Sequence, residues 1–215
     1  MKKAEHIIAR IGELLNTHLE KSKAKATPAL DQRPAEEIAE ALQLKQVFKK
    51  GFQTEHEISS FVSTYLTHTN HLQHPHYMGH QVAVPHDLAG IPELIHGTVN
   101  NPSSLYEMGP AGATCEGFMI NWMLDKVGWF EGDDYYDFHF SPGKASGVLT
   151  HGGSVANLTA LAAARAAIAP DAWTEGNPSD LVVIGAASTH YSIARALSIL
   201  GLGEKAFYPV AVNEN

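Results

Sequence analysis

Two glycines and a serine at positions 152–154 are the residues of this sequence best suited to chemistry. A short apolar run at 147–150 precedes them, and an alanine-rich helical pattern at 155–168 follows. A strand that ends in Gly152-Gly153-Ser154 and opens a helix turns several backbone N–H groups toward one point, where the helix dipole adds partial positive charge. The pattern predicts a phosphate-binding turn. This segment alone leaves open the alternative of a tight turn without a ligand.

A second polar turn follows the next apolar run. Residues 181–185 are fully apolar, as expected of a buried parallel strand, and Thr189 and His190 come soon after them. A helix to about residue 200 and a strand at 206–212 complete a strand–helix alternation, which predicts an α/β domain with right-handed crossovers. Ligands of such domains lie at the carboxyl ends of the strands. Both polar turns are expected at that edge, and together they favour the phosphate ligand.

A serine hydrolase is the enzymatic alternative. Gly152-Gly153-Ser154-Val155-Ala156 is a variant of the nucleophile elbow, with Ser154 as nucleophile, His190 as base and Asp171 or Asp180 as the orienting acid. However, one segment cannot serve as both oxyanion loop and elbow, and the triad would be confined to two adjacent strand–helix units. The pattern therefore disfavours a hydrolase.

Five histidines lie between residues 68 and 80, a density that raises the question of a metal site. No carboxylate or cysteine lies among them, and Pro75 and Gly79 indicate a loop. We therefore predict no metal site and interpret these side chains as exposed or in contact with a ligand. They are His68, His71, His74, His76 and His80.

Composition and charge narrow the class of protein further. The chain has 215 residues, of which 44% are hydrophobic and 18% charged, as in globular proteins. Residues 1–50 carry a net charge of +3 and residues 51–215 a net charge of −11, so the acidic body argues against nucleic-acid binding. No apolar run approaches the length of a membrane span. The single cysteine, Cys115, allows no internal disulfide and leads us to expect a cytoplasmic protein.

The first part of the chain predicts amphipathic helices. Apolar residues recur at helical spacing in 3–25, a second helix is expected from Pro34 to Lys50, and Thr54 to Glu57 has the form of a capping box. These helices show no core of their own. We therefore divide the chain into a helical arm for dimerisation, residues 1–72, and the first part of an α/β domain, residues 73–215.

The sequence resembles the group II pyridoxal-phosphate-dependent amino acid decarboxylases. This family includes glutamate, diaminobutyrate and aromatic amino acid decarboxylases. The resemblance runs from about Phe48 to the last residue. It depends on four segments in order: His74-Pro75-His76-Tyr77, Gly109-Pro110-Ala111, the run from Gly147 to Asn157, and His190-Tyr191-Ser192. It implies the large domain of the PLP-transferase type I (aspartate aminotransferase-like) α/β fold, incomplete here and preceded by the helical arm.

The resemblance also implies roles for individual residues. Gly153 and Ser154 are expected to hold the phosphate of pyridoxal 5′-phosphate, Gly152 to supply the turn, and Asn157 to add a hydrogen bond. His190 is expected to stack on the cofactor ring and to take part in proton transfer, which makes it the predicted catalytic residue. His80 and Gln81 correspond to a segment that reaches the substrate. They complete the expected site for the decarboxylation of an L-amino acid.

Two groups that the family needs are expected beyond the matched region. One is an aspartate that pairs with the ring nitrogen, and the other is a lysine, usually after a histidine, that binds the cofactor covalently. Lys144 and Lys205 are the last two lysines here, and neither follows a histidine. We therefore expect the N-terminal half of an enzyme, inactive alone and able to lack the cofactor, that forms a homodimer or joins the missing C-terminal half. The alternative is a non-catalytic phosphate-binding fragment that assembles with a partner chain.

Overall fold

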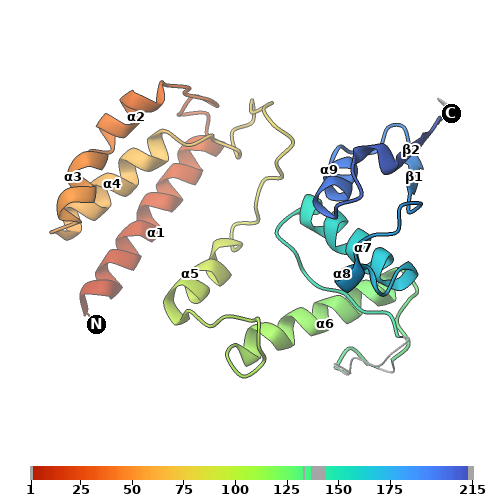
Figure 1. Cartoon of the computed structure of the whole chain (residues 1–215). Helices are drawn as coiled ribbons and strands as arrows, with labels where there is room; N and C mark the ends of the chain where they lie inside the picture. The colour runs from red at the N-terminus through yellow and green to blue at the C-terminus, as the bar shows by residue number, and fades with distance from the viewer. Residues whose placement is uncertain (1, 133, 137–143, 213–215) are drawn as a thin grey trace. The chain divides into compact units, whose positions relative to one another are not determined.

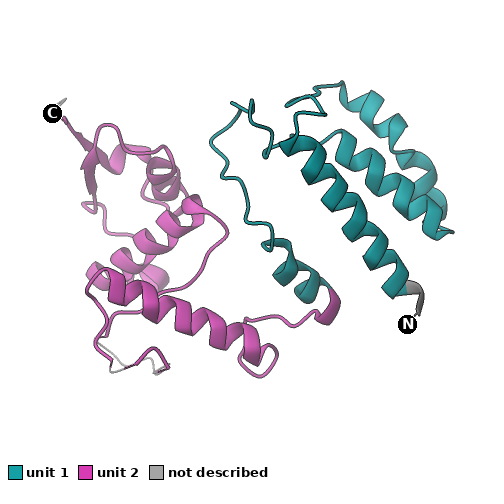
Figure 2. Ribbon diagram, turned by 180° about the vertical axis from the view of Figure 1, so that it is seen from behind, with its two compact units in different colours: residues 1–97 teal, residues 98–215 magenta. Residues whose placement is uncertain are grey.

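The computed structural model describes residues 2–132, 134–136 and 144–212. The chain forms two compact units, residues 1–97 and residues 98–215, which are coloured separately in Figure 2. The sequence predicts a different boundary, between a helical arm (residues 1–72) and the first part of an α/β domain (residues 73–215). That boundary stays a prediction. Each unit is described by itself below.

The first unit is helical (Figure 1). Helix α1 packs along α4, and half-buried apolar side chains such as Leu14 and Leu66 line a shared cavity between them. This pairing confirms the amphipathic helices expected near the N-terminus. The helices are α1 (Lys2–Lys23), α2 (Ala35–Ala41), α3 (Leu44–Lys50), α4 (Glu55–Thr67) and α5 (Gly90–Val99), the last of which runs across the boundary between the units.

The single helix expected from Pro34 to Lys50 is wrong, because Gln43 adopts a left-handed conformation with φ of 51° and separates α2 from α3. Apolar spacing explains the break. Leu42 and Val47 are five residues apart, which would turn Val47 away from the apolar face of a continuous helix. The left-handed residue resets the register, so that Leu44 and Val47 are both half-buried.

The predicted capping box at the start of α4 is confirmed. The Thr54 hydroxyl accepts a hydrogen bond from the Glu57 amide at 3.1 Å, and the Glu57 carboxylate accepts one from the Thr54 amide at 3.1 Å. These two bonds satisfy amide donors that the helix leaves unpaired at its N-terminus.

The second unit carries the α/β elements. Strands β1 (Val183–Ala186) and β2 (Phe207–Val210) pair in parallel, with Val183 opposite Phe207 and Ala186 opposite Val210. Helix α9 (Ser192–Ile199) connects them and packs on α7 (Gly153–Ile168). The predicted order of two parallel strands around a helix is confirmed. The remaining elements are α6 (Pro110–Lys126), α8 (Ala172–Glu175) and the 3-10 turn η1 (Glu204–Ala206).

The strand expected at residues 147–150 is wrong, because this segment has no strand partner among the described residues. The Leu149 amide donates instead to the Glu116 carboxylate of α6 at 3.0 Å. Val148 and Leu149 are both more than half exposed. An apolar sequence favours a strand, but a strand also requires a neighbour that satisfies its backbone.

The two most deeply buried apolar residues of the second unit lie on α9, which packs on α7. Leu197 is 0% exposed and Ala196 1% exposed. At the end of α9 the carbonyl of Leu200 accepts hydrogen bonds from Arg165 at 3.2 Å and from Asn177 at 2.7 Å. Arg165 also donates to the Asn177 side chain at 3.2 Å, so α7, α9 and the loop between them are held together.

Two stacked histidines make the stability of the first unit depend on pH. The rings of His18 and His71 lie 4.6 Å apart, and the Thr27 hydroxyl lies 3.2 Å from Nδ1 of His71. Burial lowers the pKa of both imidazoles below 6.5, and the neighbouring His71 and His74 lower the pKa of His18 and His71 respectively. Both histidines are therefore neutral in the folded state over a wider range of pH than in the unfolded state.

We expect the free energy of unfolding to be fully retained above pH 6.5 and to fall as the pH drops through the lowered pKa values, because the unfolded state then binds protons first. Thermal unfolding followed by circular dichroism between about pH 5 and about pH 8 measures this loss. The His71→Gln variant should flatten the dependence, whereas His56→Gln, at an exposed position, should preserve it. Equal slopes for wild type and His71→Gln would contradict the assignment.

Candidate active site

The glycine turn predicted from the sequence lies at the N-terminus of α7. Gly152 precedes the helix with φ of 89° and ψ of 165°, a conformation that only glycine adopts without strain. Its amide donates to the Thr150 carbonyl at 2.9 Å, and its carbonyl accepts from the Ala156 amide at 3.2 Å. Gly152 therefore supplies the turn, as its sequence position predicts.

The first turn of α7 presents unpaired donors. The helix has no side-chain cap, and within the described part of the chain the amides of Gly153, Ser154 and Val155 have no acceptor. All three residues are exposed, and a Cβ atom built on Gly153 would meet no atom within 4 Å. Converging amides at the positive end of a 16-residue helix, with a serine hydroxyl beside them, form a donor set that fits a phosphate group.

His190 is an exposed residue in the turn between β1 and α9, and its ring lies 4.1 Å from that of Tyr191 between centroids, tilted by 36°. Its Nδ1 accepts the Ser192 amide at 3.2 Å and lies 2.9 Å from the Ser192 hydroxyl. The imidazole thereby caps the first turn of α9. Among the described residues, Nε2 has no hydrogen-bond partner.

Asn157 connects the two predicted parts of the site. Its amide nitrogen donates to the Ser192 hydroxyl at 2.8 Å, one turn into α7. Two hydrogen bonds therefore join the helix of the glycine turn to His190. The sequence pattern indicates no role for Ser192, although Ser192 belongs to His190-Tyr191-Ser192, one of the four segments that carry the family resemblance. The hydrogen bond from Asn157 to the cofactor phosphate, which the family resemblance implies, stays a prediction.

The predicted substrate residues His80 and Gln81 lie in an exposed segment of the first unit. The glycine turn and His190 belong to the second unit, and the roles of His80 and Gln81 stay predictions. Neither Asp171 nor Asp180 bonds to His190 among the described residues, because Ser192 takes Nδ1. The alternative serine-hydrolase triad therefore lacks an aspartate on Nδ1 of His190 in the described part of the chain.

A glycine in one of the family-like segments has a steric explanation. A Cβ atom at Gly109, the residue before α6, would lie 2.5 Å from the backbone carbonyl of Pro102. Any side chain there would displace the loop that leads into α6. Gly109-Pro110 thus begins α6 with a close backbone approach and a proline suited to the first helical turn.

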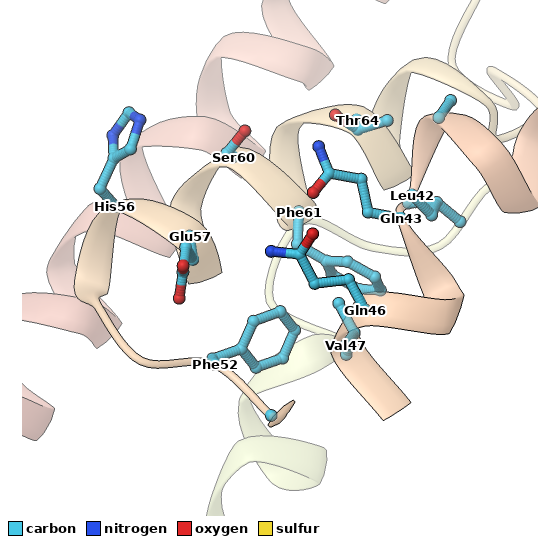
Figure 3. Close-up of a pocket in the computed structure, with 12 residues that line it drawn as sticks. Leu42, Gln43, Gln46, Val47, Phe52, His56, Glu57, Ser60, Phe61 and Thr64 are labelled. Atoms are coloured by element: carbon cyan, nitrogen blue, oxygen red, sulfur yellow. The ribbon is translucent and has the colours of Figure 1, made fainter. Parts of the chain in front are cut away.

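The first unit contains a separate cavity of about 220 Å³ beside α3 and α4 (Figure 3). Phe52 and Phe61 meet edge to face at 5.2 Å on one side, and Gln43 and Gln46 line it from α3 and the turn before it. The Glu57 carboxylate at its rim is already used in the capping box. No ligand chemistry follows from this cavity.

The described residues contain no candidate metal centre and no candidate membrane-spanning helix. No group of three or more histidine, cysteine, aspartate or glutamate side chains there could hold a metal ion. In the same part of the chain, no helix is long and apolar enough to cross a membrane.

Residues 35–213 match the pyridoxal-dependent decarboxylase conserved domain. The match covers most of the sequence, so the chain belongs to the family of pyridoxal-phosphate-dependent amino acid decarboxylases. This membership confirms the resemblance seen in the sequence and implies pyridoxal 5′-phosphate as the cofactor.

Individual amino acid decarboxylases also resemble the chain in sequence. The chain is 24% identical over 185 residues to L-2,4-diaminobutyrate decarboxylase of Acinetobacter baumannii, covering 79% of this chain and 34% of that protein. It is 30% identical over 134 residues to glutamate decarboxylase of Drosophila melanogaster, covering 60% of this chain and 24% of that protein. The chain thus spans about a third or less of these relatives.

Solved structures confirm the fold class. The crystal structure of mouse CSAD superposes with a TM-score of 0.79 at 21% identity, covering 98% of this chain and 42% of that one. The glutamate decarboxylase domain of a Vibrio parahaemolyticus diaminobutyrate-pyruvate transaminase and L-2,4-diaminobutyrate decarboxylase gives 0.78 at 21% identity, covering 97% and 44%. The chain therefore has the fold of part of a PLP-transferase domain, preceded by helices.

Proposed function

We propose that this chain supplies the phosphate-binding turn and the ring-stacking imidazole of an enzyme that decarboxylates an L-amino acid. The observation that carries the proposal is the link from the first turn of α7 through Asn157 and Ser192 to His190. It joins, in one unit, the donor set that would hold the phosphate of the cofactor and the imidazole that would stack on its ring.

The residues divide the work as follows. When bound, pyridoxal 5′-phosphate draws the electron pair of the breaking Cα–carboxylate bond into its ring. The amides of Gly153 and Ser154 and the Ser154 hydroxyl bind the phosphate and fix the cofactor at the helix N-terminus. His190 stacks on the cofactor ring and takes part in proton transfer through Nε2. His80 and Gln81 contact the amino acid substrate.

The substrate is an amino acid whose side chain the present residues do not define, since the relatives are named for diaminobutyrate, glutamate and aromatic amino acids. We place the protein in the cytoplasm, as a homodimer or in association with the rest of a decarboxylase. Because neither Lys144 nor Lys205 follows a histidine, we further propose that the 215 residues alone release no carbon dioxide.

Cofactor binding by the chain tests the proposal. We expect pyridoxal 5′-phosphate to bind with a shifted phosphorus NMR signal, because the amides at the start of α7 contact its phosphate. Pyridoxal, which lacks the phosphate, should bind at least about tenfold more weakly, a difference of about 1.4 kcal/mol. The Ser154→Ala variant should weaken binding of the phosphate form, and Ser198→Ala, an exposed hydroxyl on α9, should not.

Two outcomes would contradict the proposal. Equal binding of pyridoxal and pyridoxal 5′-phosphate would remove the phosphate-binding role of the turn. Covalent attachment of the cofactor at Lys144 or Lys205 after borohydride reduction, together with carbon dioxide release from a labelled amino acid, would refute the inactivity of the chain alone.

A further inference from the structure

The buried hydroxyl of Ser192 binds neither cofactor nor substrate in the proposed function, although it lies between Asn157 and His190. Ser192 is only 2% exposed. Its hydroxyl lies 2.8 Å from the Asn157 side-chain nitrogen and 2.9 Å from Nδ1 of His190. Ser192 thus occupies the centre of a polar chain that crosses from α7 to the start of α9.

The direction of these hydrogen bonds follows from the backbone. The Ser192 amide can only donate, and it lies 3.2 Å from Nδ1 of His190. Nδ1 must therefore accept, and a neutral imidazole with an accepting Nδ1 carries its proton on Nε2. The Ser192 hydroxyl accepts from Asn157 and directs its own proton toward the same Nδ1, whose single lone pair it shares with the Ser192 amide.

The opposite polarity conflicts with the helix. If Nδ1 carried the proton and donated to the hydroxyl, its N–H would face the amide N–H of Ser192. That amide belongs to the first residue of α9 and has no acceptor within the helix. His190 would then leave a donor unsatisfied at a helix end next to a buried serine, which is unfavourable.

We infer that Ser192 and Asn157 are positioning residues that hold His190 in the Nε2–H tautomer and fix its ring. The proton then resides on the nitrogen without a partner among the described residues, where it is available to a ligand. The functional value of this arrangement rests on the proposed role of His190. The tautomer itself is a property of the chain without cofactor.

Nitrogen NMR of the chain labelled in its histidine rings tests the inference, with the His190 signals assigned by their loss in His190→Gln. Wild type should show a protonated Nε2 and an unprotonated Nδ1. Ser192→Ala should change the ratio of the two tautomers by roughly 2- to 10-fold toward Nδ1–H, the effect of losing one hydrogen bond. Ser192→Thr, which keeps the hydroxyl, should restore the wild-type ratio.

Asn157→Asp gives a nearly isosteric second variant. A carboxylate in place of the amide only accepts, so it should draw the Ser192 proton away from His190 and favour Nδ1–H. Ser198→Ala, on the same helix at an exposed position, should leave the tautomer unchanged. An unaltered His190 spectrum in both folded Ser192→Ala and Asn157→Asp chains would overturn the inference.

The experiment separates this inference from the proposed function. Failure of wild type to bind pyridoxal 5′-phosphate through its phosphate would refute the function while leaving the tautomer measurement intact. A merely structural Ser192 would lower the melting temperature in Ser192→Ala without changing the tautomer ratio, and that result would count against positioning.

Discussion

Replacing Leu197 with alanine should destabilise the second unit by about 2–5 kcal/mol, the range measured for deleting a large buried aliphatic side chain. Leu197 is 0% exposed in α9, a helix that packs on α7 and on η1. Its removal leaves a cavity that the surrounding residues cannot fill without moving. Urea unfolding followed by circular dichroism, with linear extrapolation to water, measures the loss.

The same helix provides a matched control for Leu197. Ile199 is 64% exposed, so Ile199→Ala should change the free energy of unfolding by no more than about 0.5 kcal/mol. Similar destabilisation by the two substitutions would mean that α9 is not anchored by Leu197. A large effect of Leu197→Ala alone would identify the buried side of α9 as part of the core of this unit.

Gly152→Ala should destabilise the same unit by about 1–3 kcal/mol, because φ of 89° and ψ of 165° lie in a region reserved almost entirely for glycine. Relief of this strain requires the backbone to rotate just before α7. We therefore expect binding of pyridoxal 5′-phosphate to weaken about tenfold or more, since the amide donors no longer converge. Urea unfolding without cofactor and titration with cofactor measure the two effects separately.

Gly153→Ala is the matched control, one residue further along. Gly153 is helical, a Cβ there meets no atom within 4 Å, and alanine favours a helix by up to about 1 kcal/mol over glycine. Stability should therefore stay equal or rise, while the added methyl group hinders the approach of a phosphate. Unchanged stability in Gly152→Ala, or unchanged cofactor binding in both variants, would contradict the role of this turn.

The sequence predicts the order of elements in the second unit because its patterns are local. The parallel pair β1 and β2 and the helix between them follow from two apolar runs and a polar turn. Residues 147–150 show the limit of this approach, because a strand depends on a partner that no local pattern identifies. The break at Gln43 was readable from the spacing of Leu42 and Val47, but no glycine or proline marks it.

The candidate site divides in the same way. The turns that contain Gly152 and His190 could be predicted because glycine and small polar residues before a helical pattern have a recognisable composition. The role of Ser192 could not, since a serine inside a helix pattern is ordinary and only the fold brings Asn157 within 2.8 Å of it. Long-range polar contacts of this kind arise from packing rather than from residue spacing.

The parallel pairing of β1 with β2 also bears on how the chain folds. Val183 meets Phe207 across a crossover that contains only the turn at His190, α9 and η1. Loop-closure entropy rises slowly with loop length, so a short crossover makes this contact entropically inexpensive compared with pairings between distant strands. We therefore expect this strand–helix–strand element to form before contacts between residues that lie further apart in the sequence.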